Sequence, residues 1–435
     1  MKDSKFIVAA FPYPLGSLTL QQWYNYAIVD SYARLEKHFG EDVFLPMGFD
    51  SMGLPAENAA KKLGKNPKDV TRTNILSAMR EFNRMDTLYE RKVITHSEKY
   101  QQRTKWLFKK LLEHGLAYKD KKIQHYCPSC LTTLANEQVK ELKGLQVCDR
   151  CDTEIYGKYI EQWFFKTTDY REWLINDLYK IDYPEKTKKQ QLHWLDSDKF
   201  TDWCVSRQRK WGCPIPVEGE TDTLDTFVDS SFYCLEYDKT RPVDLYIIGN
   251  EHACAHLIYA RFITKFLYNI GYIDFDEPFK KVIHQGMILK DGVKMSKSKG
   301  NVINPLEYDP GHLRMYLMFI NHYFEGGSWN DQNFKGIVKF DNRIRRWIEP
   351  KENDFNIADA SVWSDFNNLK QSVRLNFEAW KTNKVISDWM TFYNRNKNKV
   401  LSTMIKKDLK QFYSIINPTI LHENSKKETT GNIQT

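Results

Sequence analysis

The spacing of apolar residues predicts alternating strands and helices in two separate parts of the chain. Residues 5–11 form a short β-rich run that ends at a Pro/Gly turn, and residues 20–38 carry apolar and aromatic positions at helical spacing. A second buried strand is predicted over 243–249, followed by a helix over 251–270. Alternation before and after a long middle segment predicts an α/β fold with a split, doubly wound parallel sheet.

The rest of the chain is predicted to be largely helical. Residues 74–117 look mostly helical, and helical patterns rich in Lys, Asn, Trp and Phe extend over 337–350 and 360–417, as in a small bundle. The polar residues 424–435 predict a disordered tail.

Composition fits a multidomain globular protein. With 435 residues, 41% hydrophobic and 14% aromatic, the chain can hold about three domains. The net charge of +8 is compatible with nucleic-acid binding without requiring it. No apolar run approaches the ~18 residues that span a bilayer, so no membrane partner is expected. The apolar start is too short for a signal peptide and is cut by Pro12 and Pro14, so the cytoplasm is the expected location.

Four of the eight cysteines form two tight pairs. Cys127 and Cys130 make one CxxC motif, and Cys148 and Cys151 make another. Two such turns can close a tetrahedral site, and the spacing predicts a zinc ribbon with a structural Zn²⁺. A redox pair or a chance arrangement remains as the alternative. The other four cysteines are expected to be small buried apolar residues.

A lysine-rich run at residues 294–301, Lys-Met-Ser-Lys-Ser-Lys-Gly-Asn, is the most specific chemical signal in the chain. On a short Ser/Gly loop, Lys294 and Lys297 would bring two mobile ammonium groups to a triphosphate. They would neutralise the charge that builds on departing pyrophosphate. Taken alone, a lysine-rich run is also typical of a solvated surface.

This run matches the KMSKS loop of class I aminoacyl-tRNA synthetases, and further runs resemble the leucine branch of that family. They stand in the family's order and cover about residues 5–345. The matching segments are Leu45 to Asn58, Leu134 to Gln138, Trp203 to Pro216, Glu220 to Ser231, and Gly249 to His256. The chain is therefore similar to a leucyl-tRNA synthetase.

The resemblance implies a split Rossmann catalytic domain, a zinc-ribbon insertion and a C-terminal α-helical bundle. It also implies a two-step reaction. The carboxylate of leucine or a similar aliphatic amino acid attacks the α-phosphate of ATP, which enters with Mg²⁺, and gives an aminoacyl-adenylate. The acyl group then moves to the terminal ribose of tRNA. No protein nucleophile is needed, so catalysis depends on positioning and charge stabilisation.

The expected domain boundaries follow from the same resemblance. They are 1–122 for the first half of the catalytic domain, 123–158 for the zinc ribbon, 159–240 for a remnant of the connective insertion without an editing domain, 241–304 for the second half with the KMSKS loop, 305–335 for a stem-contact-like segment, 336–423 for a truncated helical bundle, and 424–435 for the tail.

The resemblance also assigns site residues. Gly249, Glu251 and His252 would cradle adenosine, and Gly249 would let the ring approach closely. Met295, Ser296 and Ser298 of the loop would also bind ATP. Asp50 would hold the substrate ammonium. The amino-acid pocket would be lined by Phe11, Tyr13, Ser230, Tyr233 and His256. Without the resemblance, such aromatic residues would be read as core, and such a histidine as a hydrogen-bonded structural residue.

The chain departs from the family at the start of the first helix. The family places two histidines there, in a His-x-Gly-His pattern that meets the ATP phosphates. Thr19 and Gln22 stand in their places, and Gln21 replaces the glycine. Losing one preorganised donor typically costs about 10²–10³ in rate, although Thr and Gln still offer neutral hydrogen bonds. Bulk at Gln21 and Trp23 is expected to crowd the phosphates.

Other departures concern editing and tRNA binding. Trp194 to Ser197 runs almost directly into Trp203, where the family carries a large editing domain, so no proofreading is expected. The part after Asn301 is short for a full bundle plus a tRNA-gripping module.

Two hypotheses remain open. One is a working ligase that charges tRNA or another acceptor such as a carrier protein. The other is an impaired pseudo-synthetase that binds ATP, an amino acid, tRNA or a protein.

Overall fold

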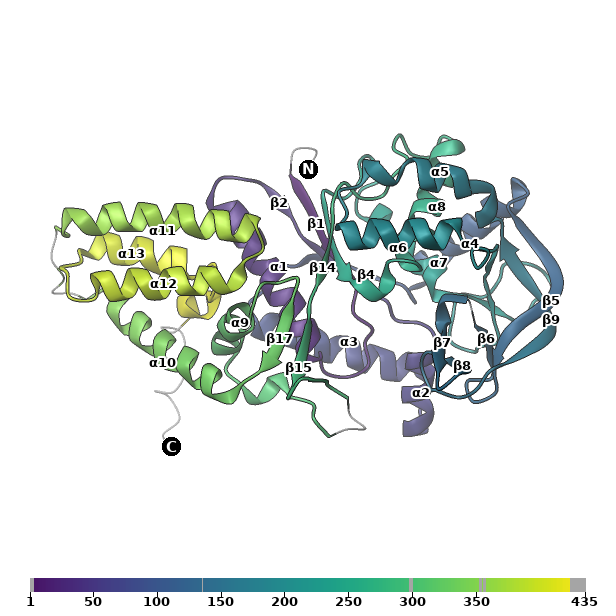
Figure 1. Ribbon diagram of the computed structural model, residues 1–435, viewed down its shortest axis with the longest axis horizontal. Coiled ribbons are helices and arrows are strands. Elements are labelled where there is room, and N and C mark those ends of the chain that lie inside the picture. The colour runs from purple at the N-terminus through teal and green to yellow at the C-terminus, as the bar shows by residue number, and fades with distance from the viewer. Residues whose placement is uncertain (1–3, 135, 297–299, 352–353, 355–356, 423–435) are drawn as a thin grey trace, which may run out of the picture.

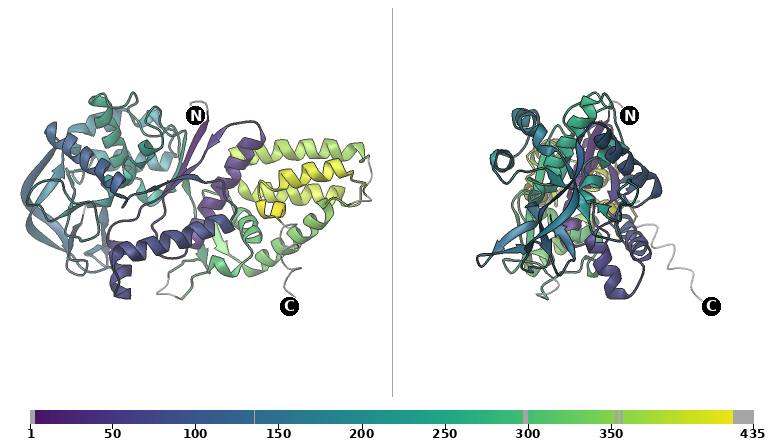
Figure 2. Two further views of the ribbon diagram at one scale, coloured as in Figure 1. Left: turned by 180° about the vertical axis from the view of Figure 1, so that it is seen from behind. Right: turned by 90° about the vertical axis from the view of Figure 1, so that its right-hand side faces the viewer.

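The computed structural model describes residues 4–134, 136–296, 300–351, 354 and 357–422. Lys297, Ser298 and the predicted tail at 424–435 lie outside these described residues. Figure 1 shows three regions in a row, with a helical bundle at one end, a parallel sheet in the middle and a curved β-ribbon at the other end. The two views of Figure 2 show the same arrangement from behind and from the ribbon end.

The central sheet joins the two halves of the chain. β1 (Lys5–Ala9) pairs with β13 (Leu245–Gly249), and β14 (Val282–Gln285) and β2 (Val43–Phe44) complete the order β14-β13-β1-β2, with every neighbouring pair parallel. The pairs in register between the two central strands are Ile7–Leu245, Val8–Tyr246 and Ala9–Ile247. The predicted α/β fold with a doubly wound parallel sheet is confirmed.

Helices cover both faces of this sheet because side chains along β1 alternate between two cores. Ile7 and Ala9 pack in one core with α1 (Leu20–His38), and Phe6 and Val8 pack in the other with α8 (His256–Asn269). The helix predicted over 20–38 is confirmed. The one predicted from residue 251 is wrong at its start, because a 3₁₀ turn, η5 (Asn250–His252), precedes α8.

The region between β2 and the ribbon contains a strand that the sequence pattern did not predict. The helices here are α2 (Leu54–Leu63), α3 (Pro67–Arg84) and α4 (Glu98–Glu113), and β4 (Glu90–Ile94) pairs in parallel with β3 (Pro46–Phe49). The prediction that 74–117 is mostly helical holds for 74–84 and 98–113, and β4 interrupts it between them. Asp86 ends α3 with a left-handed φ of 52°, and pairing with β3 overrides the weak helical pattern of 90–94.

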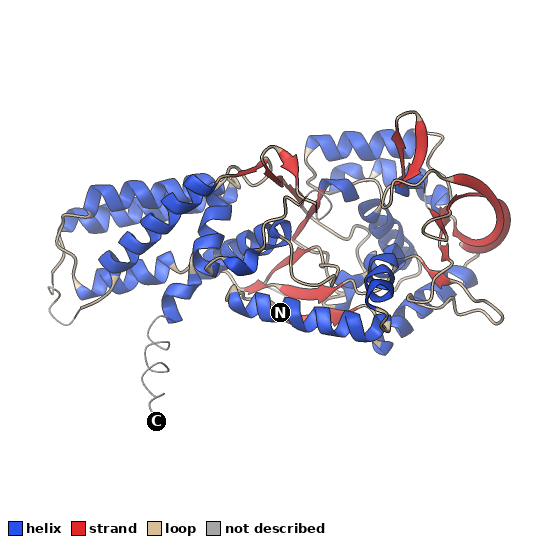
Figure 3. Cartoon of the chain, turned by 90° about the horizontal axis from the view of Figure 1, so that it is seen from below, coloured by secondary structure: helices blue, strands red, loops and turns tan. Residues whose placement is uncertain are grey.

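A long antiparallel ribbon forms the end of the molecule opposite the bundle. β5 (Ala117–Cys127) pairs with β9 (Tyr156–Phe165), flanked by β6 (Thr132–Leu134) and β10 (Trp203–Cys204). The ribbon curls strongly, as Figure 3 shows from below. The cysteine-bearing insertion lies between its strands and contains η1 (Asn136–Gln138) and a hairpin of β7 (Val139–Leu142) and β8 (Leu145–Cys148).

Buried ion pairs attach α8 to Asp177 in the segment that follows the ribbon and to Glu277 in the chain that follows α8. Lys265 Nζ lies 2.7 Å from Asp177 Oδ2 and 3.0 Å from Glu277 Oε1, and Arg261 contacts both oxygens of Glu277. Paired charges of this kind are tolerated in a core only when their partners are present. The short elements of this segment are η2 (Thr167–Tyr170), α5 (Arg171–Asn176), η3 (Leu178–Lys180), α6 (Glu185–Asp196), β11 (Ser206–Arg207), β12 (Thr223–Leu224), α7 (Thr226–Ser230) and η4 (Tyr233–Glu236).

Three short strands connect the central sheet to the bundle. β15 (Met287–Lys290) pairs with β16 (Val293–Lys294) on one side and in parallel with β17 (Gly326–Trp329) on the other. The two main chains nearly touch where this pairing begins. A Cβ atom on Gly286 would lie 2.0 Å from the backbone nitrogen of Gly326, so only glycine fits there.

The C-terminal part is helical, as predicted. Its core surrounds the buried carboxylate of Asp341, which accepts hydrogen bonds from Tyr413 at 2.6 Å and Asn417 at 3.0 Å. No helix in the described part of the chain has the length and apolar character needed to cross a bilayer. The elements are η7 (Pro305–Glu307), α9 (Pro310–Phe319), α10 (Asp331–Ile348), α11 (Ala360–Glu378), α12 (Thr382–Asn396), α13 (Thr403–Tyr413) and η8 (Pro418–His422).

A fully buried ion pair ties α1 to α9. Arg314 Nη2 donates to Asp30 Oδ2 at 2.7 Å and to Ser31 Oγ at 2.9 Å, and Nη1 donates to the Met85 carbonyl at 3.2 Å. Asp30 also accepts a hydrogen bond from Arg34 Nε at 2.8 Å. Asp30 therefore has a second cationic partner, whereas Ser31 and the Met85 carbonyl, which also accept from Arg314, are neutral.

We predict that Asp30→Asn destabilises the protein more than Arg314→Met. Breaking a buried ion pair typically costs about 3–5 kcal/mol, and we expect Asp30→Asn to fall in this range because it leaves the guanidinium of Arg314 buried without a carboxylate. Arg314→Met should cost about 2 kcal/mol, because Asp30 keeps Arg34. Urea unfolding followed by Trp fluorescence measures both changes in the free energy of unfolding.

The control is Glu378→Gln, which removes the exposed pair between Arg374 and Glu378 on α11. It should change stability by less than about 0.5 kcal/mol. Equal costs for the two buried variants, or the reverse order, would contradict the prediction.

Candidate functional site

The first turn of α1 is closed by its own side chains. Thr19 is the N-cap, and its Oγ1 accepts from the backbone nitrogen of Gln22 at 3.2 Å. The side chain of Gln22 in turn accepts from the backbone nitrogen of Thr19 at 2.8 Å, which completes a capping box. The two residues that stand in the places of the family's histidines therefore bond to each other across the helix start.

The side chains of Gln21 and Trp23, which flank Gln22, point in different directions. Trp23 is fully buried in the core, and its Nε1 donates to Glu81 Oε2 at 2.9 Å. The expectation that Trp23 crowds the phosphates is therefore wrong, because its indole points away toward α3. Gln21 instead reaches across to the second half of the chain. Its Nε2 donates to the Gly286 carbonyl, and its Oε1 accepts from the Ile288 nitrogen, both at 2.8 Å.

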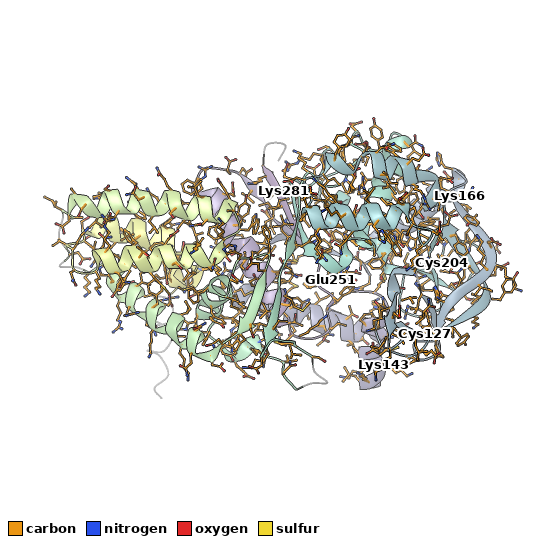
Figure 4. The ribbon with its side chains drawn as sticks, in the orientation of Figure 1. Cys127, Lys143, Lys166, Cys204, Glu251 and Lys281 are labelled. Atoms are coloured by element: carbon orange, nitrogen blue, oxygen red, sulfur yellow. The ribbon has the colours of Figure 1, made fainter. Side chains whose placement is uncertain are left out.

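A cavity of about 320 Å³ lies where α1, the end of β13 and the β15–β16 hairpin meet. It gathers six of the residues that the resemblance assigns to catalysis or to ATP, namely Thr19, Gly249, Glu251, Lys294, Met295 and Ser296. Its other lining residues are Leu20, Gln21, Gln285, Gly286, Met287, Ile288, Val302 and Ile303. Figure 4 shows Glu251 near the middle of the molecule, between the bundle and the ribbon.

The carboxylate of Glu251 folds back over Gly249. A Cβ atom on Gly249 would lie 2.3 Å from Glu251 Oε2, so the glycine is needed for this contact. In the structure, the close approach expected of a nucleotide ring is therefore made by an acidic side chain. His252 follows directly in η5, and burial lowers the pKa of its imidazole.

The described ends of the lysine loop are held together by Asn301. Its Oδ1 accepts from the Ser296 nitrogen at 2.8 Å, and its Nδ2 donates to the Lys294 carbonyl at 3.3 Å. Lys294 belongs to β16 and is exposed at the cavity. This arrangement leaves the ammonium of Lys294 in water beside the pocket. Lys297 and Ser298, assigned to catalysis and to ATP, fall in the part that the structure leaves undescribed.

The residues assigned to the amino-acid pocket form a second cluster. The rings of Phe11 and Tyr233 stack with centroids 3.8 Å apart, and both residues are buried. Phe11 also lies against Gly48, where a Cβ atom would come within 2.2 Å of the ring. Glycine at position 48, in the run that resembles the family, therefore leaves space for the ring of Phe11, which with Tyr233 forms an aromatic wall.

Asp50 lies beside this wall and is almost completely buried. Burial raises the pKa of its carboxyl to about 7, although a hydrogen bond with Tyr13 acts in the opposite direction. Burial also raises the pKa of Tyr13, and the negative charge of Asp50 raises it further. Asp50 Oδ1 has no hydrogen-bond partner among the described residues. A buried carboxyl with an open oxygen is suited to receive a cation.

Neutral hydrogen bonds link the remaining pocket residues. His256 Nδ1 lies 3.0 Å from Ser230 Oγ, and its Nε2 lies 2.8 Å from the Tyr246 hydroxyl, which also contacts the Tyr233 hydroxyl. Burial lowers the pKa of His256 to about 3, so the imidazole is neutral at ordinary pH. Its two ring nitrogens thus connect α7 to β13.

Sequence patterns did not single out Tyr246, although it belongs to this network. It stands in the middle of the buried strand β13, where an aromatic residue is expected to be core. Its stacking on Phe279, with centroids 4.1 Å apart, is core packing of this kind. Only the hydrogen bond to His256 shows its second role, and no sequence spacing encodes that contact.

The four paired cysteines lie together at the far end of the insertion. Their sulfur atoms all lie within 4.8 Å of one another, with measured separations of 3.5, 3.6 and 4.0 Å. Tetrahedral thiolate coordination with bonds of about 2.3 Å requires sulfur separations of about 3.8 Å. The cluster formed by Cys127, Cys130, Cys148 and Cys151 could therefore hold a metal ion. Figure 4 labels Cys127 in this cluster.

The remaining cysteines are separate from the cluster. Cys204, Cys213 and Cys234 are buried, and Cys254 is half-buried.

Comparison with known proteins places this geometry in context. The family model described as "tRNA synthetases class I (M)" matches residues 5–344. The leucine–tRNA ligase of Clostridium kluyveri is 31% identical, over 80% of this chain and 74% of the relative. That of Clostridium beijerinckii is 30% identical, over 87% of this chain and 78% of the relative.

Solved structures share the fold at lower identity. The LeuRS of Agrobacterium radiobacter K84, in a ternary complex with tRNA and LeuAMS, has a TM-score of 0.86 at 24% identity, over 97% of this chain and 85% of its own. A Mycobacterium tuberculosis methionyl-tRNA synthetase with methionyl-adenylate has a TM-score of 0.76 at 19% identity, over 99% and 96%.

The resemblance seen in the sequence is thereby confirmed. The family match covers most of the chain and includes both strands of the central pairing as well as the cysteine cluster. Leucine–tRNA ligases are among the relatives that are 30–31% identical to it over the aligned parts. This chain belongs to the class I aminoacyl-tRNA synthetases.

Proposed function

We propose that this protein activates leucine or a similar aliphatic amino acid with ATP and transfers the acyl group to tRNA or another acceptor, without editing. One observation supports the proposal above the others. The cavity between α1, β13 and the β15–β16 hairpin combines apolar walls with the carboxylate of Glu251 and the ammonium of Lys294. The buried carboxyl of Asp50 lies near the chain that leaves β1, since its backbone nitrogen donates to the Pro12 carbonyl at 3.2 Å. ATP and an amino acid are the two ligands that this chemistry fits.

Each group then has a role in adenylate formation. Lys294, with Lys297 from the undescribed part of the loop, stabilises charge on the departing pyrophosphate, and Mg²⁺ accompanies ATP. Glu251 and His252 flank the adenosine, and Met295, Ser296 and Ser298 complete the loop around the phosphates. Thr19 and Gln22 keep the start of α1 in place, where its backbone N–H groups favour negative charge.

The amino acid is held from the other side. Its ammonium binds Asp50, and Phe11, Tyr13, Ser230, Tyr233 and His256 shape the space for an aliphatic side chain. A neutral His256 suits this role because a charged imidazole would repel the ammonium.

The absence of editing is supported by chain length at one junction. Only residues 197–202 separate α6 from β10. The alignment with the Clostridium kluyveri enzyme spans 607 positions, far more than the 80% of this 435-residue chain that takes part. A large part of that relative therefore has no counterpart here, and we assign the missing part to the editing domain. We place the activity in the cytoplasm, and a carrier protein stays open as an alternative acceptor.

A second candidate function is a binding module without turnover. The capping box of Thr19 and Gln22 favours it, because these side chains satisfy each other and present no charge to a phosphate. Such a protein would bind ATP, an amino acid, tRNA or a protein partner and form no adenylate.

The cysteine cluster is proposed to hold a structural Zn²⁺. Four thiolates leave no position for substrate, so the ion would stabilise the insertion rather than take part in chemistry. The backbone nitrogen of Cys130 donates to Cys127 Sγ at 3.3 Å, which holds the first CxxC turn closed.

We predict that the wild-type protein catalyses leucine-dependent exchange of labelled pyrophosphate into ATP. Lys294→Ala should lower the exchange rate about 10²-fold, because it removes a cation from the leaving group. The control is Lys290→Ala on the adjacent strand, where the ammonium lies 3.6 Å from Asp331 and outside the cavity. Background exchange with all twenty amino acids, together with measurable ATP binding, would favour the binding module.

We predict that leucine binds more tightly as pH rises toward 7. The empty site holds a proton on Asp50 below a pKa of about 7, and the ammonium requires the ionised form, so binding must release that proton. The dissociation constant should fall about tenfold per pH unit between about pH 5 and 6.5 and level off above about 8. Calorimetry in buffers of different ionisation enthalpy measures the proton released.

Asp50→Asn is the matched variant for this measurement. It should bind leucine weakly and show no pH dependence in the same range, since His256 remains neutral there. A pH-independent affinity in the wild type would rule out this role for Asp50.

We predict one zinc ion per chain. Cys148→Ser should lose the metal and lower the melting temperature, because the ion's binding free energy stabilises the folded insertion. Elemental analysis and thermal unfolding, with and without chelator, provide the readouts. Cys254→Ser changes a cysteine outside the cluster and should keep the metal. Metal-free protein with a disulfide between two of the four cysteines would support the redox alternative instead.

A further inference from the structure

The carboxamide of Gln21 pairs with the main chain of β15 like a fragment of a neighbouring strand. It donates to the Gly286 carbonyl and accepts from the Ile288 nitrogen, both at 2.8 Å. The orientation of the amide is fixed by its partners, because a carbonyl can only accept and a backbone N–H can only donate. Both atoms of the carboxamide are therefore used in one two-point contact.

This contact fills a gap in the small sheet. β16 pairs only with Leu289 and Lys290, and β17 occupies the opposite edge of β15. The carbonyl of Gly286 and the N–H of Ile288 have no partner in β16, and both residues line the cavity that Gly249 and Lys294 also line. Within the described residues, a side chain from α1 takes the place of the missing strand.

A backbone acceptor and donor at the wall of a nucleotide cavity can pair with the edge of a base. Adenine presents an amino donor beside a ring-nitrogen acceptor, and the carboxamide of glutamine presents the same pair of groups. The two therefore compete for the same partners. Gln21 is half-buried at the cavity wall, so a base that used these backbone atoms would have to move it.

We propose that Gln21 is an internal ligand that occupies the base-binding edge of the nucleotide cavity, so that adenine binds only after displacing its carboxamide. The proposal rests on the proposed use of ATP and adds a determinant of nucleotide affinity. The protein with Gln21 paired cannot hold the base at this edge. The apparent dissociation constant for ATP is therefore the intrinsic constant divided by the fraction of molecules in which the edge is free, so ATP binds more weakly than it would to a free edge.

A purely structural role for Gln21 makes the opposite prediction. If the contact only ties α1 to β15, removing it loosens the wall of the cavity and weakens ATP binding. If Gln21 is an internal ligand, removing it frees two hydrogen-bonding groups for the base and strengthens ATP binding. The sign of the change therefore separates the two roles.

The experiment compares two ligands on three proteins. Calorimetry with ATP and with ribose 5-triphosphate, which has the same sugar and phosphates without the base, is run in excess Mg²⁺ on wild type, Gln21→Ala and Gln332→Ala. We expect Gln21→Ala to bind ATP about tenfold more tightly and ribose 5-triphosphate unchanged. Gln332 is an exposed residue of α10, and its variant should match wild type for both ligands.

Unchanged or weaker ATP binding by folded Gln21→Ala would overturn the proposal. So would tighter binding of both ligands alike, because the effect would then not involve the base. If that variant fails to fold, the wild type alone decides. In the wild type, ATP and ribose 5-triphosphate should bind with dissociation constants within about threefold of each other. A preference for ATP above about thirtyfold would show that the base already binds the backbone edge of Gly286 and Ile288, against the proposal.

These outcomes are separate from the test of catalysis. Tighter ATP binding by Gln21→Ala without any pyrophosphate exchange would support the proposal that Gln21 is an internal ligand and would rule out the proposed ligase activity. Robust wild-type exchange with no effect of Gln21→Ala on ATP binding would support the proposed ligase activity and would rule out Gln21 as an internal ligand.

Discussion

The parallel pairing of β1 with β13 is the contact on which both proposed ligand-binding clusters depend. It joins residues about 238 positions apart, and closing so long a loop is entropically unfavourable. Burial on both faces offsets this cost, since Ile7 and Ala9 enter one core and Phe6 and Val8 enter the other. This pairing helps to bring the start of α1 and Gly249 to one cavity.

Local patterns predicted the elements that lie at the pairing, and long-range contacts decided the rest. α1 and the strands β1 and β13 carry strong periodicity or continuous apolar runs, and the cysteine spacing defines a cluster by itself. β4 was missed because its strand character comes from β3, a distant partner. The direction of Trp23 could not be predicted, because α1 is buried around most of its circumference and has no polar face to orient it.

The site residues show the same division. The resemblance named Asp50, Glu251 and Lys294, and the structure places the last two at one cavity. The resemblance could not show how neutral and charged groups are distributed between the cavity at Glu251 and the cluster around Asp50. His256 is kept neutral by burial and by the neighbouring His252, whereas Asp50 keeps an oxygen without a partner among the described residues. Such pairing depends on three-dimensional neighbours and leaves no signature in residue spacing.

The contact between Gly286 and Gly326 has a consequence for how the molecule can vary. Each glycine lies against the backbone of the other strand, so a methyl group at either position would have to wedge β15 and β17 apart. β17 leads directly into α10, and β15 forms the wall of the cavity. A change in the seating of the helical bundle would thus reach the proposed nucleotide cavity through main-chain atoms, and side-chain repacking has little room to absorb it.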